Sequence, residues 1–387
     1  MKKYRFYYFL LIFLLISVIT GAEEFYIAEY DYFLDMPVGW QVYDVSDISR
    51  AAFANSSLTA VVQVISMAGE SYQSADAMYE ELCTEIGAEG DAAPFLFSGR
   101  DSVFSDLGFT SNGSEMRGYF IFINGRKFDF ILMAFSGNAY YEEIHDFLLS
   151  VLDSFSPSSG EKYHPGPVSQ FYYPFPGGDE QQTVLIINNR QGSIPYDQRE
   201  VAATQVLIER EARILASYEE KENRVGAWQR YYRMIYRDNY HRLDNLYQFL
   251  KNIYRTGGAG VADLPRDLLA WVQGFSYSRT GTLADLQSPL SSALTRMGDC
   301  DSRALLYTML LHHFKIDALF LVSSHYSHSL AGVNVPGQGA RIYFNDNSYL
   351  IAETTAQVDL GLIDRDMADP SGWTPVPLGD LGNVLKN

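Results

Sequence analysis

Cysteine, positive charge and long apolar runs are all scarce in this chain, and each scarcity excludes a class of protein. Two cysteines in 387 residues exclude a small fold held by several disulfides and leave one pairing, Cys83 with Cys300. A formal charge of -18 argues against a nucleic acid or an anionic membrane surface as the main partner, because both would repel the chain. No stretch after residue 22 is apolar for long enough to span a bilayer.

The chain is nevertheless rich enough in apolar residues to build sizeable cores. It is 47% hydrophobic and 20% charged, and its length predicts two or three domains. The charge is uneven, because residues 23–157 hold 22 acidic and 5 basic side chains, whereas residues 158–387 are nearly balanced. Residues 158–182 are rich in proline, glycine, serine and aromatics. We therefore expect one domain over 23–157, a linker over 158–182 and a second domain over 183–387.

The N-terminus has the pattern of an export signal. Three basic residues, Lys2, Lys3 and Arg5, precede an apolar run over residues 6–19, and the small residue Ala22 suits cleavage after it. The run is shorter than the roughly 20 residues of a spanning helix, so we favour a cleaved signal over 1–22 with a retained anchor as the alternative. The mature chain is then exported, periplasmic or extracellular, and not an integral membrane protein.

The acidic first domain alternates strand-like runs with two helical patterns, Ala75–Ile86 and Tyr140–Phe155. Asn124-Gly125 between two apolar alternating runs predicts a hairpin. The expected fold is an antiparallel sheet with packed helices. The order of these elements, opened by an extended stretch and Pro37-x-Gly39-Trp40, resembles PsbP-like domains. That resemblance implies a binding or scaffolding fold with no catalytic residues to carry over.

The second domain begins with a short strand over 183–187 and two long helices, about 197–220 and 224–254. In the second helix, tyrosines and leucines recur every three or four residues, which predicts a buried seam packed within the chain rather than a ligand-binding stripe.

A cysteine opens the apolar helix that follows. Gly298 suits a tight entry turn, Asp299 suits the N-cap, and Cys300 is the first helical residue of a run to about residue 314. Backbone N–H groups at a helix N-terminus favour a thiolate over a thiol and lower a cysteine pKa. The pattern therefore predicts a reactive nucleophile at Cys300.

Downstream strands supply a base and an acid. His328 opens one strand and Glu353 closes another, after a hairpin around Asn345–Asn347. If these strands lie side by side against the Cys300 helix, an imidazole can reach the thiol while a carboxylate holds its other nitrogen. The predicted catalytic set is Cys300, His328 and Glu353.

These motifs resemble the transglutaminase-like superfamily. The resemblance rests on Gly298-Asp299-Cys300, on His328 opening a strand, and on Glu353-Thr354-Thr355, in this order and over about 195–375. It implies a papain-like α+β core with a Cys, His, Asp triad and peptidase, amidase or acyl-transfer activity on a protein or peptide substrate, including one of the cell envelope. The family's usual Asp is replaced here by Glu353, and the tryptophan that often follows the histidine is absent.

Several alternatives stay open. His325 could be the base and Asp346 the orienting acid, and Gln273 is a candidate oxyanion donor by its chemical type alone. The other reading is an exported binding or scaffolding protein whose transglutaminase-like domain has lost catalysis.

A metal site is not expected, and neither is a cofactor. Two sets of side chains lack the ligand spacing of zinc and calcium sites, respectively: His312, His313, His325, His328 and Cys300, and then Asp364, Asp366 and Asp369.

Overall fold

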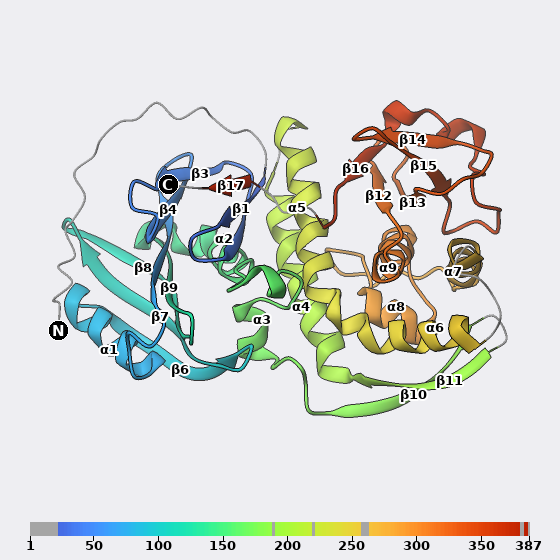
Figure 1. Cartoon of the computed structure of the whole chain (residues 1–387). Coiled ribbons are helices and arrows are strands. Elements are labelled where there is room, and N and C mark those ends of the chain that lie inside the picture. Colours follow the sequence, from blue (N-terminus) through green and yellow to red (C-terminus); the bar gives the residue numbers. More distant parts are fainter. Residues whose placement is uncertain (1–21, 188–189, 219–220, 257–262, 380–382, 386–387) are drawn as a thin grey trace.

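The structure is a computed structural model that describes residues 22–187, 190–218, 221–256, 263–379 and 383–385. The predicted signal over 1–22 therefore falls almost wholly outside the described residues. The class is α+β, as predicted, with an antiparallel sheet in the N-terminal half and a curled, half-barrel sheet in the C-terminal half (Figure 1). No described helix is long and apolar enough to cross a membrane.

A seven-stranded antiparallel sheet in the order β3-β4-β5-β9-β8-β7-β6 forms the N-terminal half. Its strands are β3 (Trp40–Asp44), β4 (Arg50–Asn55), β5 (Ala60–Ala68), β6 (Glu89–Phe97), β7 (Arg100–Ser111), β8 (Ser114–Asn124) and β9 (Phe128–Gly137). The predicted hairpin is confirmed, because Ile123 of β8 pairs with Phe130 of β9 around Asn124-Gly125.

Alternation along the strands gives this sheet two apolar faces, each covered by a helix. Ile131 and Met133 pack toward α1 (Ala75–Ile86), whereas Phe130 and Leu132 pack toward α2 (Tyr141–Asp153). Successive residues of a strand point to opposite faces, so a near-continuous apolar run such as β9 fits a strand buried on both sides. The helix predicted over 75–86 has those bounds, with the Ser74 side chain accepting the Ala77 N–H at its start.

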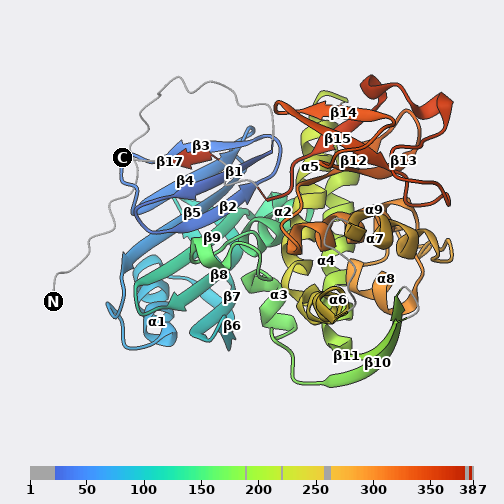
Figure 2. The ribbon, with the colours of Figure 1, turned by 45° about the vertical axis from the view of Figure 1, so that its right-hand side comes forward.

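A small three-stranded sheet joins the two ends of the described chain. Strand β1 (Glu23–Ile27) pairs antiparallel with β2 (Tyr32–Met36) and parallel with β17 (Asn383–Leu385). The C-terminal segment thus returns to the N-terminal half (Figure 2).

Residues 158–182, expected to be a linker, contain a helix that is packed into the molecule. Helix α3 (Pro167–Tyr172) contacts α2, β6 and α4, and residues 167–170 are buried. The predicted strand over 183–187 is longer, β10 (Glu180–Ile187), and pairs with β11 (Arg190–Asp197), which sequence patterning missed. These two strands form a ribbon that runs beneath α6 (Figure 1).

Of the two long helices predicted for the second domain, one is confirmed and the other is not. The first is confirmed as α4 (Gln198–Ala216). The single helix expected over 224–254 is wrong, because α5 (Lys221–Asn239) and α6 (Asp244–Thr256) are separated by a short 3₁₀ turn, His241–Leu243. The tyrosine seam does pack within the chain, since Tyr236, Leu243 and Leu250 are all buried in the C-terminal core.

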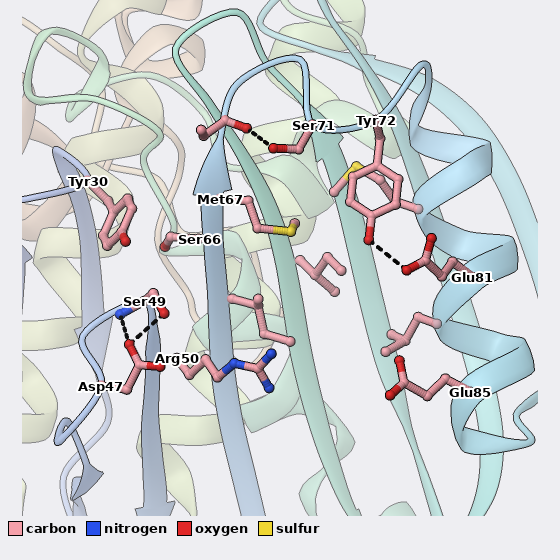
Figure 3. A pocket seen from close by; sticks show the side chains of 15 residues that line it. Tyr30, Asp47, Ser49, Arg50, Ser66, Met67, Ser71, Tyr72, Glu81 and Glu85 are labelled. Carbon is pink, nitrogen blue, oxygen red and sulfur yellow. Dashed lines mark hydrogen bonds between the residues drawn. The ribbon is translucent and has the colours of Figure 1, made fainter. Parts of the chain in front are cut away.

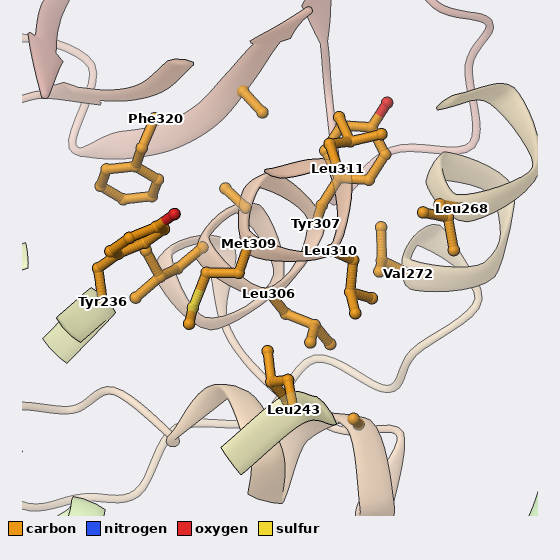
Figure 4. Close-up of a cluster of buried hydrophobic side chains, with 14 of the residues drawn as sticks. Tyr236, Leu243, Leu268, Val272, Leu306, Tyr307, Met309, Leu310, Leu311 and Phe320 are labelled. Carbon is orange, nitrogen blue, oxygen red and sulfur yellow. The ribbon is translucent and has the colours of Figure 1, made fainter. Parts of the chain in front are cut away.

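Helix α9 (Cys300–His313) is the centre of the C-terminal half. It is surrounded by α7 (Leu264–Gln273), α8 (Pro289–Thr295), α5 and the sheet, and its side chains are buried on nearly all sides (Figure 4). The sheet order is β14-β15-β13-β12-β16. Its strands are β12 (Ala318–Ser323), β13 (His328–Val333), β14 (Arg341–Phe344), β15 (Asn347–Ala352) and β16 (Thr374–Val376).

A buried network of ion pairs fixes α5 to the N-terminal half. Asp35 of β2 accepts two hydrogen bonds from Arg233 at 2.8 Å, and Arg230 donates to the Asp35 carbonyl. Arg230 also pairs with Glu211 of α4 at 2.9 Å. Because these charges are buried, each depends on its partner, and the two halves are joined by more than chain connectivity.

Candidate active site

Cys300 is the first residue of α9, as the sequence predicts. Asp299 caps the helix, its side chain accepting the Ser302 N–H at 2.9 Å. Gly298 has φ +155°, and a Cβ there would lie 2.8 Å from Ser302 Cβ and 2.9 Å from Ser292 Oγ. The entry turn therefore requires glycine both for its conformation and for space.

His328 and Glu353 are brought together by neighbouring strands. His328 opens β13, Glu353 follows the last residue of β15, and these two strands pair with each other. His328 Nε2 lies 2.8 Å from Glu353 Oε2, and Glu353 Oε1 accepts the N–H and the hydroxyl of Thr355. Although burial alone would raise it, these hydrogen bonds hold the pKa of the Glu353 carboxyl below its usual value. The pair leaves Nδ1 as the imidazole nitrogen for a substrate or a thiol.

The thiol environment differs from the sequence prediction. The Cys300 thiol is 8% exposed, and its hydrogen-bond partner among the described residues is Asp301 Oδ1 at 3.6 Å, not His328. Burial, followed by the charges of Asp301 and Asp299, raises its pKa to about 12, although the Ser329 backbone N–H acts in the opposite direction. The expected lowering by the helix N-terminus is therefore wrong for this state, because desolvation and two adjacent carboxylates outweigh the partial charge of the helix end.

Asp301 is the site residue that sequence reasoning missed. Its Oδ2 accepts the Tyr232 hydroxyl at 2.9 Å, and its Oδ1 accepts the Ser329 hydroxyl. It thus ties α5 and β13 to the start of α9. The available signal was the pair of acids flanking Cys300, which predicts an electronegative helix start.

Cys300 and His328 line one cleft of about 520 Å³. Its walls come from α4, α5, the 279–285 loop, the start of α9 and the turn between β12 and β13. Glu353 is not among the lining residues and is 3% exposed, so it lies behind the imidazole. Of the predicted set, two side chains therefore line the cleft, and the third reaches it only through the histidine.

The rival residues are placed elsewhere or are already occupied. His325 lies in the turn between β12 and β13, with its ring 4.7 Å from that of Tyr326, and does not line the cleft. Asp346 sits in the exposed turn between β14 and β15. Gln273 Nε2 donates to the carbonyls of Glu353 and Val358 at 2.8 and 2.9 Å, so its amide is engaged in the fold rather than free for an oxyanion.

Two of the histidines that lack metal-ligand spacing, His312 and His313, have hydrogen-bond partners within the fold. His312 contacts the Tyr236 hydroxyl and the Ala318 carbonyl, and His313 contacts the Met309 carbonyl. Within the described residues no group of three His, Cys, Asp or Glu side chains is arranged to hold a metal ion. Cys83 and Cys300 are both free thiols, so the one pairing that composition permits does not form.

A second cavity of about 390 Å³ lies in the N-terminal half, between the sheet and α1 (Figure 3). Its floor is apolar, with Ile65 and Met67, and Glu81 and Glu85 of α1 stand at one side. It holds no cysteine or histidine. Nucleophilic chemistry is therefore better supported at the Cys300 cleft.

Comparison with known proteins gives no family assignment. No protein-family model matches the chain, and no curated protein matches it. Three solved structures illustrate the structural likenesses. CyanoP, the PsbP of Synechocystis sp. PCC 6803, covers 36% of this chain and 93% of its own at 15% identity, with a TM-score of 0.30.

LpqN of Mycobacterium tuberculosis, involved in cell envelope biogenesis, covers 32% of this chain and 82% of its own at 11% identity, with a TM-score of 0.24. A Cytophaga hutchinsonii protein named as a candidate cysteine protease covers 82% of this chain and 75% of its own at 10% identity, with a TM-score of 0.25. TM-scores this far below 0.5 carry no argument about function.

Proposed function

We propose that this protein is an exported cysteine hydrolase of the transglutaminase-like, papain-like type, acting on an amide of a protein or peptide. The observation that carries the proposal is that His328, hydrogen-bonded to the buried Glu353, lines the same cleft as Cys300 at the start of α9. Nucleophile, base and orienting acid on a helix start and two paired strands are what acyl transfer requires.

In this mechanism His328 Nδ1 removes the Cys300 proton as the thiol attacks the carbonyl carbon. Glu353 holds Nε2–H and stabilises the imidazolium, which then protonates the leaving amine. Water releases the acyl group in a second step. Because burial and the neighbouring carboxylates raise the thiol pKa, proton transfer to His328 accompanies the attack rather than preceding it.

The domain proposal is a signal over 1–22, a PsbP-like domain over 23–157, a linker over 158–182 and a catalytic domain over 183–387. The acidic first domain would serve binding or scaffolding next to the site, with the protein acting outside the cytoplasm.

The test is cleavage of a mixed peptide library by the mature chain, read by mass spectrometry. We expect cleavage by the wild type and none by Cys300→Ala, with both folded by circular dichroism. Cleavage that survives in Cys300→Ala rules out the proposed nucleophile.

One observation favours a second function. The raised thiol pKa and the Asp301 partner are what a non-catalytic fold would tolerate, and they support an exported binding or scaffolding protein that has lost catalysis. A wild type that cleaves nothing in the library, with Cys300 alkylated no faster than Cys83, would favour this alternative.

A further inference from the structure

The Cys300 cleft extends well beyond the proposed reacting groups, along one face of α5. Four α5 residues line it at helical spacing: Arg224, Trp228, Tyr231 and Tyr232. Residues four and seven or eight positions apart share a helix face, so this face is turned toward the cleft. Its far end is Arg224, and its near end is Tyr232, which bonds to Asp301 beside the thiol.

The carboxylates that line the cleft are all satisfied within the protein. Asp285 pairs with Arg279 at 3.0 Å, and Asp299 accepts the N–H and hydroxyl of Ser302. Asp301 accepts from Tyr232, Ser329 and the thiol. Of the three, Asp285 is paired with a cation, whereas Asp299 and Asp301 have only neutral donors and keep their charge beside the thiol.

Arg224 is the opposite case. It lines the cleft, is exposed, and makes no ion pair or hydrogen bond to any residue that the structure describes. Trp228, one turn further along α5, and Leu283, which is 60% exposed, add apolar surface to the same cleft. A guanidinium next to an apolar platform suits a carboxylate that lies beside an apolar or planar group.

We propose that Arg224 binds a carboxylate of the substrate, so that the cleft selects acidic peptides. This inference rests on the proposed function and names its substrate class. The helical rise between Arg224 and Tyr232 spans about 12 Å, and an extended peptide covers about 3.3 Å per residue. The selected carboxylate therefore lies about four residues from the amide that Cys300 attacks.

Binding to the mature Cys300→Ala chain tests the proposal without relying on turnover. The probes are fluorescein-labelled ten-residue peptides of alanine, serine and glycine with both ends capped, carrying one glutamate at each position in turn, and matched glutamine peptides. A parallel set with a free C-terminal carboxylate distinguishes a side-chain source from a terminal one. Fluorescence anisotropy gives the dissociation constants.

We expect at least one acidic peptide to bind about tenfold more tightly than its glutamine match, and the second change Arg224→Gln to bring the difference below about twofold. A further set of probes carries lysine at the glutamate positions, and Arg224→Glu should reverse the preference toward these lysine peptides. Arg266→Gln is the matched control, because Arg266 is an exposed helical arginine on α7 that does not line the cleft.

Equal binding of acidic and neutral peptides, no binding, or the same loss in Arg266→Gln would overturn the proposal. Tight, Arg224-dependent binding of peptides that the wild type never cleaves would instead support the carboxylate-binding site and contradict the proposed hydrolase activity.

Discussion

Asp301→Asn should make the Cys300 thiol more reactive, which is the reverse of what most changes beside a nucleophile do. Asp301 Oδ1 lies 3.6 Å from Cys300 Sγ, and the thiol pKa is raised to about 12 by burial and by the neighbouring carboxylates. A negative charge beside a thiolate disfavours the charged form. Removing that charge therefore lowers the thiol pKa and increases the thiolate fraction at neutral pH.

The size of the effect follows from Coulomb's law. Two unit charges separated by the Sγ–Oδ1 distance interact by about 4.6 kcal/mol at an effective dielectric constant of about 20, or about three pKa units as an upper limit. The carboxylate charge is shared by two oxygens, so we expect a fall of about two units. The thiolate fraction at neutral pH then rises about 100-fold, and the less basic thiolate is about tenfold less nucleophilic. The net gain in the alkylation rate is about tenfold.

The assay is alkylation by iodoacetamide from about pH 7 to about pH 10.5, followed at each cysteine by mass spectrometry. Cys83 is an internal reference, because it is the other cysteine of the chain and is half-buried on α1 in the N-terminal half. Asp285→Asn is the control variant, since Asp285 lines the same cleft but pairs with Arg279.

The shape of the pH profile separates a lower pKa from a merely opened pocket. In Asp301→Asn the alkylation rate of Cys300 should begin to level off at about pH 10, whereas the wild-type rate should still rise with pH there. A loosened pocket would multiply the rate by the same factor at every pH. A Cys300 rate within twofold of wild type throughout would refute the electrostatic reasoning.

Three further predictions concern the acids around the site and the core. Glu353→Gln should lower the rate of peptide cleavage at least about 100-fold, toward the rate of Cys300→Ala, because glutamine cannot stabilise an imidazolium. Unchanged cleavage in the library assay would remove Glu353 from the triad. Burial and Asp301 raise the Asp299 pKa to about 6, so between about pH 4 and pH 6 the folded state holds this proton and the unfolded chain does not. The wild type therefore loses stability as the pH rises through this range. Asp299→Asn should therefore gain up to about 3 kcal/mol over wild type on going from about pH 3.5 to about pH 7 in urea unfolding, and a gain that does not vary with pH would contradict this. Asp35→Asn should cost about 3–5 kcal/mol at pH 7, because Arg233 loses its carboxylate partner and Arg230 loses one of its two; a cost below about 1 kcal/mol in the same assay would show that the network contributes little.

Local signals carried most of what could be predicted. The bounds of α1 follow from Ser74 as N-cap and Gly87 in a left-handed C-cap, and the β8–β9 hairpin follows from Asn124-Gly125. The start of α9 at Cys300 follows from its N-cap acid in the same way. These features depend on a few adjacent residues, so a single sequence is enough to find them.

Features decided by distant residues were missed. The break between α5 and α6 has no proline or glycine to mark it, and it lies at His241–Leu243, with Arg242 and Leu243 both buried. The pairing of β17 with β1 joins opposite ends of the chain. The thiol pKa depends on how deeply α9 is buried, which no helix-end argument can supply.

The position of α5 links the acidic N-terminal half to the chemistry of the cleft. Arg230 and Arg233 bond to Asp35 of β2, whereas Tyr232, between them in sequence, bonds to Asp301 beside the thiol. A rigid helix held by buried charges at one face cannot shift without moving what its other face carries. The N-terminal half is therefore part of the frame that sets the Asp301–Cys300 distance. Deleting it would remove the carboxylate partner of Arg233, leave Arg230 with Glu211 alone and take away the support of α5.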